Sequence, residues 1–151
     1  MKVILFEPQI PQNAGNIIRT CSVTGTDLMF VKPLGFATTD RWLKRAALDH
    51  MTNVPFTFCE DFKKYLEDSN NSFYFLSSKG KRRYDEVAYD EDSELIFGSE
   101  TAGLPDWIHQ TYPDRMLRIP MKPEARCLNL ATSVGIVLFE ALRQKGFKGA
   151  L

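Results

Sequence analysis

The sequence predicts an α/β protein made of a single domain, with a largely parallel sheet flanked by helices. Short continuous apolar runs, typical of strands buried on both faces, alternate with longer helix-like segments. The chain has 151 residues, which suits one domain, 1–151, with a proper core. Hydrophobic residues make up 44% and charged residues 25%, which is typical of a globular rather than a disordered chain.

The first third of the chain is expected to form two strands and two helices. The first strand covers 3–6. The helix after it begins at Asn13, whose side chain is a good N-cap, and ends at Gly25, which suits a left-handed C-terminal residue. A second strand covers 28–31, and an amphipathic helix follows over 40–48.

The rest of the chain continues this alternation. Further strands are expected at four apolar runs: 54–58, 73–76, 95–97 and 116–119. Helices are expected over 61–67 and over 129–145, the second of which ends at Gly146. The polar segment 79–94 begins basic and turns acidic, which is typical of a solvated surface loop.

Charge and cysteine content narrow the class of protein. Nineteen basic and nineteen acidic residues cancel, so a role with nucleic acid has to depend on local patches. The three cysteines, Cys21, Cys59 and Cys127, form no C-x-x-C pair and have no histidine near them in sequence, which predicts reduced thiols and no zinc site. We find no signal peptide and no apolar stretch long enough for a bilayer, so we expect a cytoplasmic protein.

Several well-known enzyme motifs are missing from the sequence. No G-x-G-x-x-G or G-x-S-x-G occurs, which disfavours a conventional dinucleotide fold and a serine hydrolase. Gly98 and Gly103 have Walker A spacing, but Leu104 and Pro105 follow where lysine and serine or threonine are needed. Cys127 has no adjacent histidine to activate it, so a cysteine hydrolase is also weakly supported.

Three polar, glycine-bearing turns follow presumed strands instead. They cover 11–19, 97–105, and 119–121 together with 126–130. Sheets of this class bind ligands at the carboxyl ends of their strands. Each turn alone has a structural explanation as a helix cap, a tight turn or a surface arginine, but the three together indicate a site.

The order of these turns resembles the three motifs of the SPOUT superfamily of RNA methyltransferases. They read N-x-G-N-I-I-R, then F-G-S-E-x-x-G-L-P, then I-P-M followed by R-x-L-N-L, and the resemblance covers essentially the whole chain. The short length and the segment 33–36 are similar to the minimal members, which 2′-O-methylate cytidine or uridine 34, the wobble nucleotide of tRNA.

The resemblance implies a fold, a cofactor and partners. The fold would carry a C-terminal trefoil knot, an exception to the rule that chains do not thread loops, with knot and cofactor site formed by about 73–146. The cofactor would be S-adenosyl-L-methionine, with S-adenosyl-L-homocysteine as product and no metal. The partners would be the tRNA anticodon stem-loop and a second copy of the chain in a homodimer.

The resemblance also assigns site residues. Cofactor-binding positions would be six: Leu76, Gly98, Ile119, Cys127, Leu128 and Asn129. Cys127 stands where members often have serine. The catalytic residues would be Arg19, Asn13 and Glu100. Because arginine keeps its proton at any pH near neutral, we expect Arg19 to fix a phosphate and stabilise a developing alkoxide rather than act as a neutral base. Asn13 would orient Arg19 or the ribose, and Glu100 would position Arg19 or backbone donors.

RNA binding requires cations, and two clusters supply them. We expect phosphate contacts from five side chains: Arg41, Lys44, Arg45, Lys79 and Arg82. The terminal helix is apolar nearly all round, which fits either a dimer interface or burial within one chain. Alternatives are the same reaction on another tRNA position or on ribosomal RNA, or a non-catalytic RNA-binding protein on this scaffold. The joint presence of Asn13, Arg19, Glu100 and Asn129 argues against the last.

Overall fold

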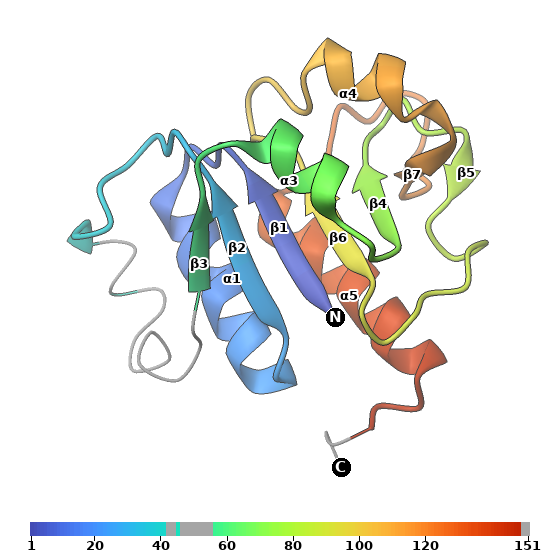
Figure 1. Cartoon of the computed structure of the whole chain (residues 1–151), viewed down its shortest axis with the longest axis horizontal. Coiled ribbons are helices and arrows are strands. Elements are labelled where there is room, and N and C mark those ends of the chain that lie inside the picture. The colour runs from blue at the N-terminus through green and yellow to red at the C-terminus, as the bar shows by residue number, and fades with distance from the viewer. Residues whose placement is uncertain (42–44, 46–55, 149–151) are drawn as a thin grey trace.

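The computed structural model describes residues 1–41, 45 and 56–148. Within these residues, seven strands form one sheet in the order β3-β2-β1-β6-β4-β7-β5, and every pairing is parallel (Figure 1). The strands are β1 (Lys2–Phe6), β2 (Asp27–Val31), β3 (Phe56–Cys59), β4 (Phe73–Leu76), β5 (Arg82–Arg83), β6 (Glu94–Phe97) and β7 (Met116–Arg118). The helices are α1 (Pro11–Thr24), α3 (Phe62–Asp68), α4 (Asp106–Thr111), the 3-10 turn Pro113–Arg115 and α5 (Leu130–Gln144). The predicted fold class, an α/β domain with a parallel sheet, is confirmed.

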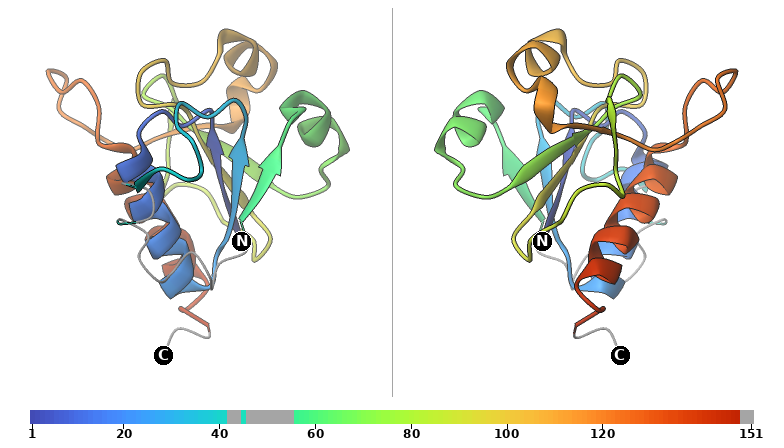
Figure 2. Two further views of the ribbon diagram at one scale, coloured as in Figure 1. Left: turned by 90° about the vertical axis from the view of Figure 1, so that its left-hand side faces the viewer. Right: turned by 90° about the vertical axis from the view of Figure 1, so that its right-hand side faces the viewer.

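Helices cover both faces of the sheet. On one face α1 and α5 lie side by side and pack against alternate residues of the central strands (Figure 2). On the other face α3 and α4 cover a second apolar cluster that includes Ile4, Phe75 and Ile96. The strands therefore bury both faces, which explains why they appear in the sequence as continuous apolar runs.

The predicted strands agree closely with the observed ones. The runs at 3–6, 28–31, 73–76 and 95–97 are all strands, and the run at 116–119 ends one residue early as β7. The strand predicted at 54–58 is found as β3, and residues 54 and 55 lie outside the described part. The helix predicted over 40–48 lies mostly outside it as well, since only Asp40, Arg41 and Arg45 of this range are described.

The structure tests the residues predicted to begin and end the helices. Gly25 ends α1 at φ +63°, as predicted, and Asn129 caps α5 by accepting hydrogen bonds from the backbone N–H groups of Ala131 and Thr132. The prediction that Asn13 caps the first helix is wrong. The helix begins at Pro11, because proline is well suited to the first helical position, where its missing N–H costs no hydrogen bond.

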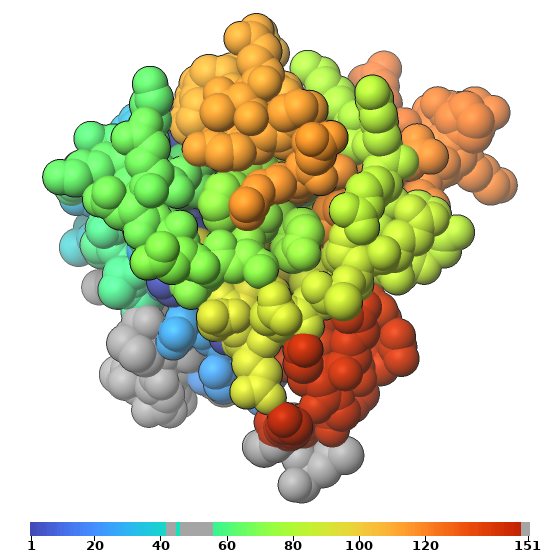
Figure 3. Space-filling view, turned by 45° about the vertical axis from the view of Figure 1, so that its right-hand side comes forward, coloured from blue at the N-terminus to red at the C-terminus, as the bar shows by residue number. Residues whose placement is uncertain are grey.

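The segment 79–94 was predicted as a solvated loop, and this is wrong for its second half. Val87 is 5% exposed and Tyr89 is 1% exposed, and both belong to the core that packs on α5. Figure 3 shows the yellow-green segment running along the surface directly beside the red α5. Charged residues surround these two residues in the sequence, so the local pattern did not predict their burial.

Part of the apolar surface of α5 is buried within its own chain. Val134, Val137 and Leu138 are fully buried within the single chain. Phe139 of the same helix is 47% exposed, and Val23 of the neighbouring α1 is 64% exposed. Burial in one chain therefore explains one side of the helix and leaves apolar surface on the other.

Candidate ligand site at the carboxyl edge of the sheet

A cavity of about 450 Å³ lies where β4, β6 and β7 end. The loops that follow these strands form most of its wall, and the start of α1 and of α5 completes it. The six predicted cofactor positions all line this cavity: Leu76, Gly98, Ile119, Cys127, Leu128 and Asn129. Three segments far apart in sequence thus converge on one site, as expected for the carboxyl ends of parallel strands.

Some residues of the wall were not predicted. The missed residues include Ile10, Ser77, Ser78 and Ser133. Ser77 and Ser78 directly follow β4, so the rule that ligands bind beyond the carboxyl ends of strands identifies them from sequence. Ile10 and Ser133 belong to the wall only because α1 and α5 begin next to each other, which no local pattern shows.

The loop after β6 is a tight turn that only glycine permits. The backbone N–H and C=O groups of Ser99 and Gly103 exchange hydrogen bonds of 3.1 and 3.0 Å. Gly103 has φ +68°, and a Cβ on Gly98 would lie 2.3 Å from the carbonyl carbon of Gly103. The two glycines therefore close this turn on itself, and their Walker A spacing reflects that turn.

Glu100 projects from this loop and holds the turn that leads into α1. Its Oε2 accepts a hydrogen bond of 2.8 Å from the N–H of Gln9, and its Oε1 accepts one of 3.2 Å from the N–H of Ile10. The side-chain amide of Asn13 also donates to Oε1, at 3.0 Å. Of the two roles predicted for Glu100, these contacts correspond to the positioning of backbone donors.

Asn13 and Asn129 extend this network to α5. The amide nitrogen of Asn129 donates a 2.8 Å hydrogen bond to Oδ1 of Asn13, while its own Oδ1 caps α5. Asn13 is 6% exposed and so uses both ends of its buried amide. A continuous chain of polar contacts, which we call the Glu100 network (Glu100, Asn13 and Asn129), therefore joins the loop after β6 to the starts of both helices.

Arg19 follows Asn13 on the same helix. It is half-buried near the middle of α1, about 9 Å along the helix from Asn13 and about 120° around its axis. In the described part of the chain, Arg19 is not among the side chains that line the cavity. Its predicted catalytic role therefore depends on what approaches the outer side of α1.

The predicted RNA-binding cations are spread over the surface. Lys79 comes directly after Ser78 of the cavity wall, and its Nζ lies 3.9 Å from Oδ1 of Asp106. Arg82 is exposed on β5. Arg41 and Arg45 are exposed, whereas Lys44 lies outside the described residues. The structure thus places Lys79 beside the cavity. The RNA-binding role of Arg41, Lys44 and Arg45 stays a prediction.

The buried thiol of Cys21 does not offer an alternative catalytic group. Burial and the nearby Asp27 carboxylate raise the pKa of Cys21 to about 12, so this thiol is inert at neutral pH. Among the described residues, no three His, Cys, Asp or Glu side chains come together to hold a metal ion. Within the same residues, no helix is long and apolar enough to cross a membrane.

Fold and cavity together define an α/β protein with an organic-ligand site at the carboxyl edge of a parallel sheet. Residues 1–139 match the SpoU rRNA Methylase family, and the chain belongs to that family. It is 41% identical over 153 residues to the tRNA (cytidine(34)-2′-O)-methyltransferase of Escherichia coli K12, covering 100% of this chain and 98% of the relative.

Solved structures show the same relationship. One structure, reported for insights into the 2-OH methylation of C/U34 on tRNA, is 36% identical with a TM-score of 0.90 and covers 96% of this chain and 95% of its own. The AdoMet-bound rRNA methyltransferase of Sinorhizobium meliloti is 28% identical with a TM-score of 0.83. The match covers 94% of this chain but only 55% of that longer protein.

Proposed function

We propose that this protein transfers a methyl group from S-adenosyl-L-methionine to the ribose 2′-hydroxyl of nucleotide 34, cytidine or uridine, of tRNA. The observation that carries the proposal is the convergence of all three sequence motifs on one cavity. Near-complete coverage of a relative named for cytidine 34 supports the choice of nucleotide. We also propose that the enzyme works in the cytoplasm, where its tRNA substrate is modified.

The cavity suits S-adenosyl-L-methionine in size and chemistry. Its volume of about 450 Å³ lies within the range of small-molecule sites, roughly 300–1,000 Å³. Leu76, Ile119 and Leu128 offer apolar walls for a flat base, and Ser77 and Ser99 offer hydroxyl groups beside the backbone of the loops. When bound, the cofactor supplies the methyl group and its own leaving group, so the reaction as proposed requires no metal ion.

The chain's own residues then have two tasks, alignment and charge stabilisation. The Glu100 network holds the loop after β6 and the starts of α1 and α5 in one arrangement, so that the ribose oxygen and the methyl donor meet at a fixed distance. Arg19 holds a phosphate next to the target ribose and stabilises the negative charge that develops on its oxygen. Cys127 contributes to the wall in place of serine.

We also propose a homodimer formed through the outer faces of α1 and α5. These two helices lie next to each other (Figure 2). Val23 and Phe139 expose apolar surface on them. A dimer through this face brings Arg19 toward the second subunit. Light scattering should give twice 17.3 kDa at micromolar concentration, and a mass near 17.3 kDa would contradict the dimer.

The C-terminal knot over about 73–146 belongs to the same proposal. The strand β7 lies between β4 and β5, and the segment that follows β5 is bound to α5. The later strand β7 is therefore inserted between two strands that precede it in the chain, which supports a threaded C-terminus.

The same reaction on ribosomal RNA is the second candidate. The rRNA methyltransferase of S. meliloti shares the fold, but this chain spans only about half of its length. Mass spectrometry of nucleosides from a strain lacking the gene decides between the two. Loss of the 2′-O-methyl group at nucleotide 34 of tRNA is expected, and loss from ribosomal RNA instead would overturn the proposal.

A further inference from the structure

A second cavity, of about 460 Å³, lies beside the first. Both are bordered by the segment 119–129, which precedes α5 and projects from the body of the molecule (Figure 2). The second cavity is lined by Ser78, Arg118, Ile119, Pro120, Met121, Lys122, Pro123, Ala125 and Arg126. Three of these residues, Ser78, Ile119 and Met121, also line the first cavity, so the two spaces share a wall.

The second cavity is strongly cationic. Arg118, Lys122 and Arg126 line it, and among the described residues no carboxylate does. None of these three cations takes part in a salt bridge within the part of the chain that the structure describes. In a protein whose total charge is zero, this is a local concentration of positive charge directly beside the ligand site.

The backbone holds these cations in place. Arg118 is the last residue of β7, and its carbonyl accepts a 3.0 Å hydrogen bond from the N–H of Tyr84. The loop at Gly80 packs directly on this strand, since a Cβ on Gly80 would lie 2.6 Å from the carbonyl carbon of Leu117. The floor of the cavity is therefore the carboxyl end of β7, a strand that is paired on both sides.

A tight turn places the other two cations on facing arms. The N–H of Ala125 donates a 2.9 Å hydrogen bond to the carbonyl of Lys122, with Pro123 at the second position, where its fixed φ favours a turn. The chain reverses there, so Lys122 precedes the turn and Arg126 follows it. The next residue after Arg126 is Cys127, which lines the first cavity.

We infer that this second cavity, which we call the phosphate groove (Arg118, Lys122 and Arg126), binds backbone phosphates of the RNA strand next to the target nucleotide. The inference rests on the proposed function, because the target ribose has to lie at the mouth of the first cavity. Phosphates next to this ribose then meet the shared wall and the cations behind it. The three residues are positioning residues, since they set where the strand lies and do not contact the reacting atoms.

The test compares two double variants that remove the same charge. Lys122→Gln with Arg126→Gln alters the groove, and Lys63→Gln with Lys64→Gln alters exposed lysines on α3, which covers the opposite face of the sheet from α5. Each variant is titrated with a fluorescently labelled tRNA transcript at several salt concentrations. Each lost single-strand phosphate contact lowers the slope of log affinity against log salt by about 0.7, so the groove variant should lose about 1.4.

Enzyme kinetics and cofactor binding separate positioning from other roles. The groove variant should show a raised KM for tRNA with kcat nearly unchanged at saturating tRNA, because uniform binding of the strand is lost. Its affinity for S-adenosyl-L-methionine, measured by calorimetry, should equal that of wild type. A fall in that affinity would assign the two cations to the cofactor loop and overturn the inference.

The groove and the proposed function fail in different measurements. If the slope and KM of the groove variant match those of the α3 variant, the groove is overturned even though wild type methylates nucleotide 34. If wild type leaves nucleotide 34 unmethylated, the proposed target is overturned, while a slope change of about 1.4 still supports a phosphate groove.

Discussion

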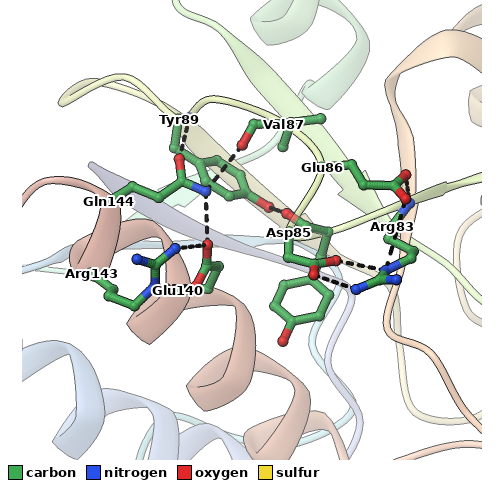
Figure 4. Close-up of polar contacts among 9 residues, drawn as sticks. Arg83, Asp85, Glu86, Val87, Tyr89, Glu140, Arg143 and Gln144 are labelled. Atoms are coloured by element: carbon green, nitrogen blue, oxygen red, sulfur yellow. Dashed lines mark hydrogen bonds and ion pairs between the residues drawn. The ribbon is translucent and has the colours of Figure 1, made fainter.

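Gln144, on the last turn of α5, fastens the segment around Val87 to that helix. Its amide nitrogen donates to the carbonyl of Val87 at 3.1 Å and to Oε1 of Glu140 at 2.9 Å, and its oxygen accepts from the N–H of Tyr89 at 3.1 Å (Figure 4). Replacing Gln144 by leucine keeps a side chain of similar size. It removes the partners of one carbonyl and one N–H group next to the buried Val87 and Tyr89.

The magnitude follows from these two backbone groups. A buried polar group left without a partner costs about 1–3 kcal/mol, and Gln144 is half-buried, so we expect a total loss of about 2–4 kcal/mol. Domains of this size are stable by about 5–15 kcal/mol, so the loss is a large fraction. At about 2–4 °C per kcal/mol, the melting temperature should fall by about 4–16 °C.

Urea denaturation at equilibrium, with unfolding and refolding curves that coincide, measures this loss. Arg143→Gln is the control, because Arg143 is the neighbouring residue and its own side chain, which forms a salt bridge with Glu140, is 63% exposed. We expect a clearly smaller loss of unfolding free energy for the control, and an unchanged dependence of that free energy on urea concentration for both variants. A loss below about 1 kcal/mol for Gln144→Leu would refute the argument that two backbone groups depend on this amide.

Three further predictions concern the site and acid stability. Arg19→Ala should fold and keep its cofactor affinity in calorimetry but lose about 10²–10³ in methyl-transfer rate, and a near wild-type rate would remove Arg19 from the mechanism. Glu100→Ala should lower both cofactor affinity and rate, since three N–H donors lose their acceptor; intact binding would contradict its positioning role. Hydrogen bonds from Arg143 and Gln144 lower the pKa of Glu140, so its contribution is present above the unfolded value of about 4.3 and lost as pH falls further. Glu140→Gln should therefore flatten acid unfolding curves, and an unchanged curve would argue against this linkage.

The strands could be predicted from sequence because burial on both faces leaves a local mark. Each central strand is an uninterrupted apolar run, and the polar turns after these runs indicated the cavity. The six-residue α4 and the two-residue β5 were missed, since neither is long enough to show a period.

Asn13 shows why the rest could not be predicted. A cap is a local signal, and asparagine before an apolar stretch fits it well. The side chain instead bonds to Glu100 and Asn129, which are 87 and 116 residues away in sequence. The burial of Tyr89 has the same kind of cause, because it packs on Tyr74 of β4 and bonds to Gln144 of α5. Such contacts exist only once the sheet has brought the loops together.

The contacts of Glu100 bear on the route of the proton that leaves the ribose hydroxyl. Both of its carboxylate oxygens are engaged, one by the N–H of Gln9 and the other by the N–H of Ile10 and the amide of Asn13. A carboxylate committed to three donors holds loops in place and has little capacity left to take up a proton. Arginine is a poor base because it stays protonated at neutral pH. We therefore expect the proton to leave to water as the methyl group is transferred.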